Sequence, residues 1–464
     1  MKKQPSFIQA LTVIILILAL IFIGLFEFKA EPHIPLIISL VFLGCLGKLW
    51  KYKWKDIEEG IVKGITLGIK PILILALVGL LISAWMSSGT IPMILSLGLD
   101  WISPKYFLIS ALVITVLVST FTGSTFTTVS TVGVALMGIA TAVGISPALT
   151  AGAVVSGAAF GDKMSPLSDT TNFSSGILDV KLFDHVRHMM WTTVPSLLLT
   201  AIIFIVVGFQ SDYSHINLNE LKHLKDVLGD QFTLSWIALI SPLIVIVLSA
   251  RRAEVVPTLI AGIASAFITA LLIQHQFSVS DLLTFLQSGV KIDSGNSIVD
   301  GIVNKGGLQS MMWTISLVLT ALSLGGVMKE LGIVQALLDG LTKMIRRTGD
   351  VTLTTVLACI GVNVITGEQY LSILLPGQTF RPLYDKWGLD RKNLSRTLED
   401  AGTLVNPLIP WGVSGAFISQ ALNVDVVSYL PFAFFLIFCP VFAVIWGYTG
   451  IGIAKVTPKK DVAA

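Results

Sequence analysis

The sequence predicts an all-α polytopic membrane protein made of two inverted-topology repeats, with helical hairpins and discontinuous transmembrane helices. The chain has 464 residues, of which 54% are hydrophobic and 13% charged, and its mean hydropathy is +0.83. Soluble domains carry about 25% charged residues. Apolar runs of roughly 18 residues or more, long enough to span a bilayer as helices, recur along the whole chain. A set of repeated motifs predicts the two halves.

The first predicted repeat covers residues 1–209. Within it, residues 106–143 form an apolar stretch that is too long for one crossing, so we expect a helical hairpin there. Residues 147–178 combine apolar sequence with helix-breaking residues and are expected to form a broken transmembrane helix. The polar segment 210–231 is then predicted to be an extracellular linker between the halves.

The second predicted repeat covers residues 232–454 and has the same order of elements. Its hairpin is expected at 351–388 and its broken helix at 392–421, followed by a cytoplasmic tail at 455–464. The connector 274–307 contains 280–286, which resembles a short helix on the outer surface, although we favour a simple solvated connector.

Short motifs recur between the halves at nearly one spacing of about 241 to 244 positions, in matching elements. The first half begins inside and the second outside, so the repeats are inverted, as in many secondary transporters. The motif pairs are Gly60-Ile61-Val62 with Gly301-Ile302-Val303, Thr122-Gly123-Ser124 with Thr366-Gly367-Glu368, and Ser165-Pro166-Leu167 with Asn406-Pro407-Leu408.

Lysine and arginine residues are concentrated in alternate loops. The loops rich in these residues face the cytoplasm under the positive-inside rule. This distribution places both termini in the cytoplasm and the protein in the cytoplasmic membrane as a multi-pass protein. Whether each hairpin re-enters or crosses fully is left open, because both arrangements give the same sidedness.

The stretch 158–172 contains the largest group of candidate ion-binding residues. A helix is not expected to run smoothly through Gly161 and Ser165-Pro166, and carbonyls freed in the membrane must be satisfied by protein, ion or water. Na⁺ is a hard cation that prefers oxygen ligands. We therefore predict that Asp162 and Asp169 bind Na⁺, aided by the hydroxyl groups of Ser165, Ser168 and Thr170.

Further candidates lie at the hairpin tips and in the second break. The first tip, which includes Ser124, is expected to face the first break, and the second tip carries Glu368. Asp400 and Asn406 lie in the second break. A carboxylate that binds Na⁺ when ionised and a proton otherwise couples the two ions by competition. All four residues are predicted to bind an ion or a proton.

Each candidate also has a purely structural interpretation. Asp162 and Asp169 are suited to capping helix ends at the break, and membrane hydroxyls often bond back to their own helix. Lys163 either neutralises a neighbouring carboxylate, which we favour, or contacts an organic anion. Glu368 is harder to explain structurally, because an unpaired carboxylate in a re-entrant tip has no packing use.

For other ionisable residues, solvation at the surface is the structural interpretation. Glu399 and Asp400 lie near the predicted cytoplasmic end of their helix, where both could simply face water. His185 and His188 flank Arg187 at a cytoplasmic helix start. Their near-neutral titration would suit a pH sensor, but we favour plain surface placement.

The segment Gly157-Ala158-Ala159-Phe160-Gly161-Asp162-Lys163-Met164-Ser165-Pro166-Leu167-Ser168-Asp169-Thr170-Thr171 closely resembles the signature of the NhaC-type Na⁺/H⁺ antiporter family. The chain length, the inverted halves and Glu399-Asp400-Ala401-Gly402 fit the same family. The resemblance implies exchange of Na⁺ for H⁺ by alternating access. The family also includes malate-2H⁺/Na⁺-lactate antiporters, and the motif does not separate the two activities.

Alternatives outside secondary transport are weaker. A channel would need a continuous polar stripe, whereas the breaks here are local and paired. An enzyme would need a metal-spaced histidine cluster or a nucleophile with its base, and the sequence offers neither. We expect no cofactor, and Na⁺, H⁺ and the lipid bilayer as partners. Malate and lactate would join them under the alternative activity. A homodimer is compatible with the sequence, and nucleic acid is not an expected partner.

Overall fold

The structure is a computed structural model that describes residues 4–101, 103–210, 218–251 and 253–456. Eight of the described helices are long and apolar enough to cross a membrane. The predicted all-α polytopic membrane protein is therefore confirmed. The α-helices before residue 232 are α1 (Phe7–Phe22), α2 (His33–Leu49), α3 (Trp54–Leu67), α4 (Ile69–Ser87), α5 (Thr90–Trp101), α6 (Phe107–Thr122), α7 (Thr125–Thr128), α8 (Val134–Val143), α9 (Pro147–Met164), α10 (Asp169–Gly176), α11 (Leu182–Gln210) and α12 (Leu218–Gln231).

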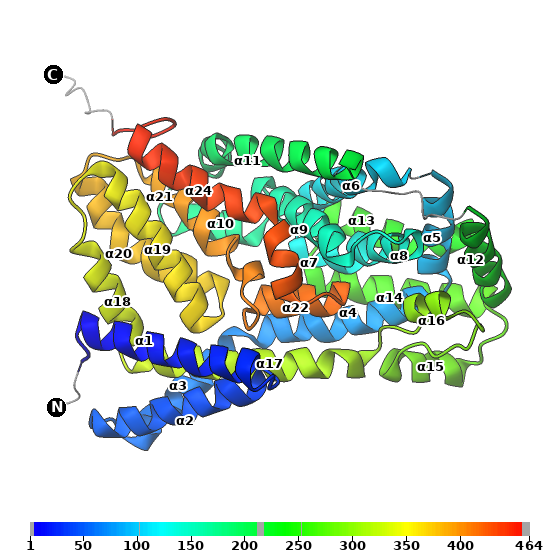
Figure 1. Cartoon of the computed structure of the whole chain (residues 1–464), viewed down its shortest axis with the longest axis horizontal. Helices are drawn as coiled ribbons and strands as arrows, with labels where there is room; N and C mark the ends of the chain where they lie inside the picture. The colour runs from blue at the N-terminus through cyan, green and yellow to red at the C-terminus, as the bar shows by residue number, and fades with distance from the viewer. Residues whose placement is uncertain (1–3, 102, 211–217, 252, 457–464) are drawn as a thin grey trace.

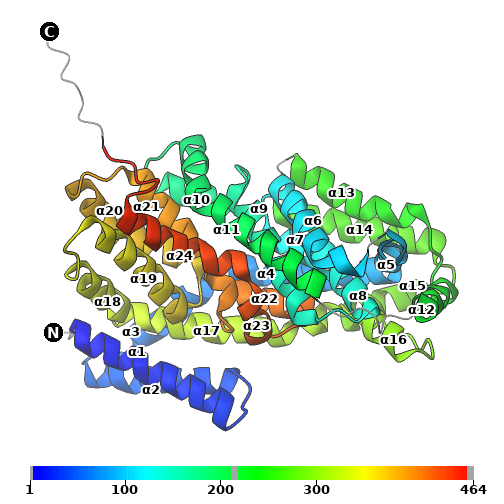
Figure 2. The ribbon, with the colours of Figure 1, turned by 45° about the horizontal axis from the view of Figure 1, so that its top comes forward.

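Helices from distant parts of the chain pack side by side. Helix α3 packs against α17, α9 packs against α6, and both α11 and α19 pack against α24. The start of α1 and the end of α24 lie at the same end of the molecule in both views (Figures 1 and 2). The later α-helices are α13 (Ile240–Ala250), α14 (Val255–Ile273), α15 (Val279–Ser288), α16 (Ser297–Val303), α17 (Met312–Glu330), α18 (Ile333–Thr342), α19 (Thr348–Thr366), α20 (Gln369–Lys386), α21 (Arg391–Leu398), α22 (Val413–Leu422), α23 (Val426–Tyr429) and α24 (Phe434–Thr449).

The two hairpins turn through the same kind of tip. Helix α6 is capped by Gly123 with φ 64°, and α19 is capped by Gly367 with φ 66°. Glycine suits both positions because a left-handed backbone carries no Cβ penalty there. The returning arm of the first hairpin is α7, the π-helix η3 (Val129–Gly133) and α8, and the returning arm of the second is α20.

The first broken helix consists of α9 and α10. Helix α9 ends at Met164, and Ser165 is extended with φ −78° and ψ 128°. Contrary to our expectation, Gly161 does not break the helix. A Cβ at Gly161 would lie 2.5 Å from both Ser119 Cβ and Thr120 N of α6, so the glycine serves close helix packing instead.

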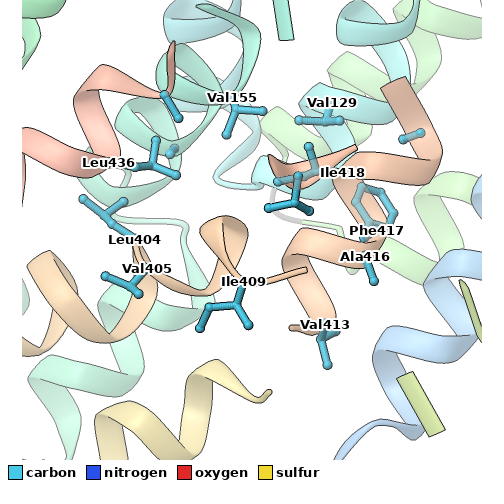
Figure 3. Packing of buried hydrophobic residues seen from close by; sticks show 14 of the residues in the cluster. Val129, Val155, Leu404, Val405, Ile409, Val413, Ala416, Phe417, Ile418 and Leu436 are labelled. Atoms are coloured by element: carbon cyan, nitrogen blue, oxygen red, sulfur yellow. The ribbon is translucent and has the colours of Figure 1, made fainter. Parts of the chain in front are cut away.

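The second broken helix changes geometry over a longer stretch. Helix α21 continues into the π-helix η6 (Glu399–Thr403), then a 3₁₀ turn η7 (Asn406–Leu408), and resumes as α22. Figure 3 shows apolar side chains of this break gathered with Val129, Val155 of α9 and Leu436 of α24. The break is thus buried among helices from both halves of the sequence, as irregular backbone in a membrane must be.

Several connectors carry more structure than the sequence analysis predicted. The predicted linker 210–231 contains α12, and residues 211–217 lie outside the described residues. Residues 280–286 do form a helix, since they lie within α15. In the predicted tail, 457–464 also lie outside the described residues. The inverted relation of the two repeats and their boundaries remain predictions.

Candidate functional site

Both breaks and both hairpin tips meet at one cavity of about 650 Å³. Four carboxylates line the cavity: Asp162, Asp169, Glu254 and Glu368. Within the described residues, no three His, Cys, Asp or Glu side chains are grouped to hold a metal ion. A cation in the cavity would therefore draw on hydroxyl, carbonyl or water oxygens as well as carboxylates. The other lining residues include Lys70, Thr122, Gly123, Ser124, Thr125, Asn172, Gln369, Tyr370, Thr403, Pro407 and Ser414.

Asp162 is half-buried on the last turn of α9 and joins the break to the first hairpin. Its Oδ2 accepts hydrogen bonds from Thr125 N at 2.9 Å and from Thr125 Oγ1 at 2.7 Å. Its Oδ1 is buried and has no hydrogen-bond partner among the described residues, although the Ser168 hydroxyl is near. Asp162 thus caps the start of α7, a helix remote in sequence, and still keeps one oxygen free beside the cavity.

Asp169 is the first residue of α10 and is exposed. Its Oδ1 accepts from Thr170 N at 2.9 Å, and its Oδ2 accepts from the hydroxyl group of Tyr370 at the second hairpin tip. The cap of α10 is Ser168. Asp169 therefore bridges the first break to the second hairpin at the rim of the cavity, in a more open position than a closed ion cage requires.

The two hairpin-tip candidates, Ser124 and Glu368, each cap the returning arm of their own hairpin. Ser124 Oγ accepts from Thr127 N at 3.2 Å, and Glu368 Oε2 accepts from Leu371 N at 2.8 Å. Our argument that a carboxylate at this tip has no structural use was wrong. At each tip the sequence shows a glycine followed by a polar residue that can accept a hydrogen bond. A glycine that ends one helix, followed by a side chain that caps the next, is a pattern that indicates this structural role.

The hydroxyl groups of Ser165, Ser168 and Thr170 are buried but do not line the cavity. Ser165 Oγ accepts from Leu167 N at 3.2 Å, and Ser168 Oγ lies 3.1 Å from Thr170 Oγ1. These groups hold the break in shape. In this conformation these residues therefore position the carboxylates of the break and do not contact the cavity themselves.

Asn406 connects the second break to the second hairpin tip through the hydrogen bonds of its side-chain amide. Its Nδ2 donates to Asn363 Oδ1 at 3.0 Å and to Gly367 O at 3.1 Å, and its Oδ1 accepts from Ser414 N at 2.8 Å. Its amide is thus used in protein contacts. Asn406 therefore fixes the second hairpin tip against the start of α22.

Lys163 is fully buried and pairs with Asp400, which comes from the other half of the chain. Asp400 Oδ1 also accepts from Thr192 Oγ1 at 2.9 Å, and Arg396 Nε lies 4.0 Å from Asp400 Oδ2. Neither Lys163 nor Asp400 lines the cavity. The carboxylate that Lys163 neutralises is therefore distant in sequence, and Lys163 is not placed to contact an organic anion in the cavity.

The alternative interpretation of Glu399 and Asp400 as solvated residues is wrong, since both have zero exposure. Helix α21 carries them into the interior between α19, α20 and α24. The sequence did hold a signal: Arg396 lies one turn before Asp400, and a buried carboxylate needs such a cation.

The surface placement of His185 and His188 is also wrong. Both are buried on the face of α11 that meets α21. His185 lies 2.8 Å from Ser395 Oγ and 3.2 Å from Ser174 Oγ, and His188 lies 3.0 Å from Asn393 Oδ1. The spacing 185, 188 and 192 places both histidines on one helix face with Thr192, which could have indicated burial.

The sequence analysis missed two residues of the site, Thr125 and Tyr370. Thr125 was part of the first tip but was not singled out, and its contact with Asp162 depends on the approach of α6 and α7 to α9. Tyr370 had no sequence signal, because its partner Asp169 is 201 positions away.

Interrupted membrane helices whose ends converge with hairpin tips on a carboxylate-lined cavity define a secondary transporter that couples to cations. A sequence profile of the Na⁺/H⁺ antiporter family matches residues 4–170 and 157–451. The chain therefore belongs to the Na⁺/H⁺ antiporter family.

Characterised relatives agree over nearly the full length. The chain is 52% identical to the Na⁺/H⁺ antiporter NhaC of Alkalihalophilus pseudofirmus, covering 98% of each chain. It is 46% identical to the Na⁺/H⁺ antiporter NhaC of Bacillus subtilis, covering 96% of this chain and 99% of that one. It is 33% identical to the malate-2H⁺/Na⁺-lactate antiporter of Bacillus subtilis, covering 97% of this chain and 96% of that one.

Proposed function

We propose that this protein exchanges Na⁺ for H⁺ across the cytoplasmic membrane by alternating access. The observation that carries the proposal is the cavity where Asp162, Asp169 and Glu368 meet between both breaks and both tips. Na⁺ prefers oxygen ligands, and half-helix ends at a break supply carbonyls in addition to side chains. The high identity to two Na⁺/H⁺ antiporters supports the same ion pair.

Na⁺ is bound at Asp162, with Asp169 across the cavity as the second carboxylate. The free Oδ1 of Asp162 supports this assignment, because a buried carboxylate oxygen without a partner is costly unless a cation or water meets it. Exchange also requires that Na⁺ and H⁺ exclude one another, so that one ion leaves as the other binds.

The lining of the cavity extends to a turn that the proposal places on the cytoplasmic side. It reaches the turn between α13 and α14, where Ser249, Ala253 and Glu254 line it. The lysine and arginine distribution assigns that turn to the inside. Both termini are cytoplasmic under the same assignment.

Proteoliposomes containing the purified protein and a pH-sensitive dye test the function. A Na⁺ gradient should move protons in the absence of any organic acid. Proton movement that requires malate on one side and lactate on the other would establish the alternative activity. Lys163 does not support that alternative, because it is buried, pairs with Asp400 and does not line the cavity that an organic acid would enter. No Na⁺-dependent proton movement under either condition would refute the proposal.

A further inference from the structure

Behind the cavity lies a buried cluster of four charged side chains: Lys163, Arg396, Glu399 and Asp400. All four have zero exposure. Two are formally cationic and two anionic, so the cluster is neutral when every group is ionised. Three of them have partners: Lys163 pairs with Asp400, and Arg396 NH1 donates to Gly452 O at 2.8 Å.

Glu399 differs from the rest of the cluster. Both of its carboxylate oxygens are buried without a hydrogen-bond partner among the described residues. The hydroxyl groups of Ser174 and Thr403 are its neighbours but do not meet hydrogen-bond geometry. A buried, unpartnered carboxylate is costly to keep ionised, and such groups in native proteins call for a functional explanation.

The local backbone sets Glu399 apart as well. Glu399 is the first residue of the π-helix η6, which ends at Thr403. Short π-helical segments inside α-helices occur frequently at functional sites. This one turns two acidic residues inward at the point where the second broken helix leaves regular geometry.

Glu399 has a short route to the cavity through Thr403. Thr403 lines the cavity, yet its hydroxyl group is buried and has no hydrogen-bond partner among the described residues. On the other side, Ser174 bonds to His185, which in turn bonds to Ser395. Thr403 therefore lies between the cavity and the Glu399 carboxylate.

We propose that Glu399 carries the transported proton at a site separate from the Na⁺ ligands, and that it exchanges this proton with the cavity through Thr403. The inference rests on the proposed Na⁺/H⁺ exchange and names its proton-binding group. In the transfer, the Thr403 hydroxyl group gives its proton to a Glu399 oxygen and takes one from a hydronium ion in the cavity, which becomes water. Release runs the same steps in reverse.

Coupling follows from the charge of the cluster. With Glu399 ionised the cluster is neutral, and with Glu399 protonated it carries one positive charge. Asp162 is adjacent to Lys163 in α9 and interacts electrostatically with Glu399. Protonation of Glu399 therefore weakens Na⁺ binding at Asp162, and bound Na⁺ disfavours protonation by the same factor.

Other titratable and charged groups surround the cluster and interact with it electrostatically. They face Glu399 or its charged neighbours from each element packed against it: Asp162 and Lys163 of α9, His185 and His188 of α11, Cys359 of α19, Tyr384 of α20, Arg396 and Asp400 of its own helix, and Cys439 of α24.

The test measures ²²Na⁺ binding to purified protein from pH 6 to 9. In the wild type, the apparent Na⁺ affinity should fall by up to about tenfold for each unit by which the pH is lowered, as expected for one linked proton. Glu399→Gln fixes the neutral form, so its affinity should stay weak and change by less than about twofold per unit. Glu399→Asp should restore the slope. A slope retained in Glu399→Gln, or loss of all Na⁺ binding in folded Glu399→Gln protein, would overturn the inference.

Transport assays distinguish an effect on proton binding from an effect on Na⁺ binding. In Glu399→Gln proteoliposomes, Na⁺ uptake driven by a pH gradient should fall at least tenfold, while Na⁺/Na⁺ exchange stays within about twofold of wild type. Glu59→Gln is the control, because Glu59 lies on the exposed face of α3 beside Lys63. Equal loss of both activities in Glu399→Gln would show a structural role only.

Thr403→Val keeps the test decisive if Glu399→Gln does not fold, because valine preserves the shape of threonine and removes only the hydroxyl. Proton-driven Na⁺ uptake should fall at least about fivefold in this variant, while Na⁺/Na⁺ exchange is kept. Normal proton-driven uptake in Thr403→Val would refute the route. The proposed function itself fails only if the wild type moves no protons in response to Na⁺.

Discussion

Replacing Asp162 by asparagine tests the Na⁺ site most directly. Asparagine has the shape of aspartate, and its amide oxygen can still accept the two hydrogen bonds from Thr125 at 2.9 and 2.7 Å. The cap on α7 is therefore largely kept, at a cost of about 1 kcal/mol for the weaker neutral bonds. The change removes the negative charge that faces the cavity.

The loss in Na⁺ affinity follows from that charge. A hydrogen bond or contact to a charged group is worth about 1.5–3 kcal/mol, and this range corresponds to about 10- to 150-fold in affinity. Coulomb's law at an effective dielectric of about 20 allows about 4 kcal/mol at a separation of about 4 Å, so the range is conservative. We expect Asp162→Asn to bind Na⁺ about 10- to 150-fold more weakly.

The assay is ²²Na⁺ binding at one alkaline pH, with elution volume and thermal unfolding as checks of the fold. Asp339→Asn is the matched control, because Asp339 lies on an exposed face of α18, where Gln335 donates to it at 2.8 Å. An affinity within twofold of wild type in folded Asp162→Asn protein would refute the placement of Na⁺ at Asp162.

Three further predictions follow from the site and the packing around it. Asp169→Asn should reduce Na⁺-driven proton movement in proteoliposomes at least about tenfold while the protein still inserts; normal transport would exclude Asp169 from the ion path. Gly161→Ala should lower the thermal stability by about 1–3 kcal/mol through overpacking against α6, whereas Gly176→Ala, with open space around its Cβ position, should not. In a cysteine-free background, an impermeant maleimide should label Ser280→Cys from outside intact cells and Lys181→Cys only after permeabilisation; labelling of both from one side would refute the topology.

The sequence alone determined the class of protein and the segments that matter. Apolar length and low charge require membrane helices, because hydrocarbon leaves no other way to satisfy the backbone. Pro166 and Pro407 likewise locate the interruptions, since proline removes a donor from a helix. The stretch 158–172 therefore identified the first break and its two carboxylates. Gly161 shows the limit of such sequence arguments. A glycine can either end a helix or allow two helices to pack closely, and the sequence does not distinguish these two roles.

The tertiary structure decided which partner each ionisable group has. Lys163 pairs with Asp400, Asp169 with Tyr370, and Asp162 with Thr125, each across a long sequence separation or between helices that meet only in the fold. No local pattern encodes such contacts. The burial of Glu399 has the same cause: a hydrophilic helix end is solvated or enclosed according to the helices that pack around it, and α19, α20 and α24 enclose this one.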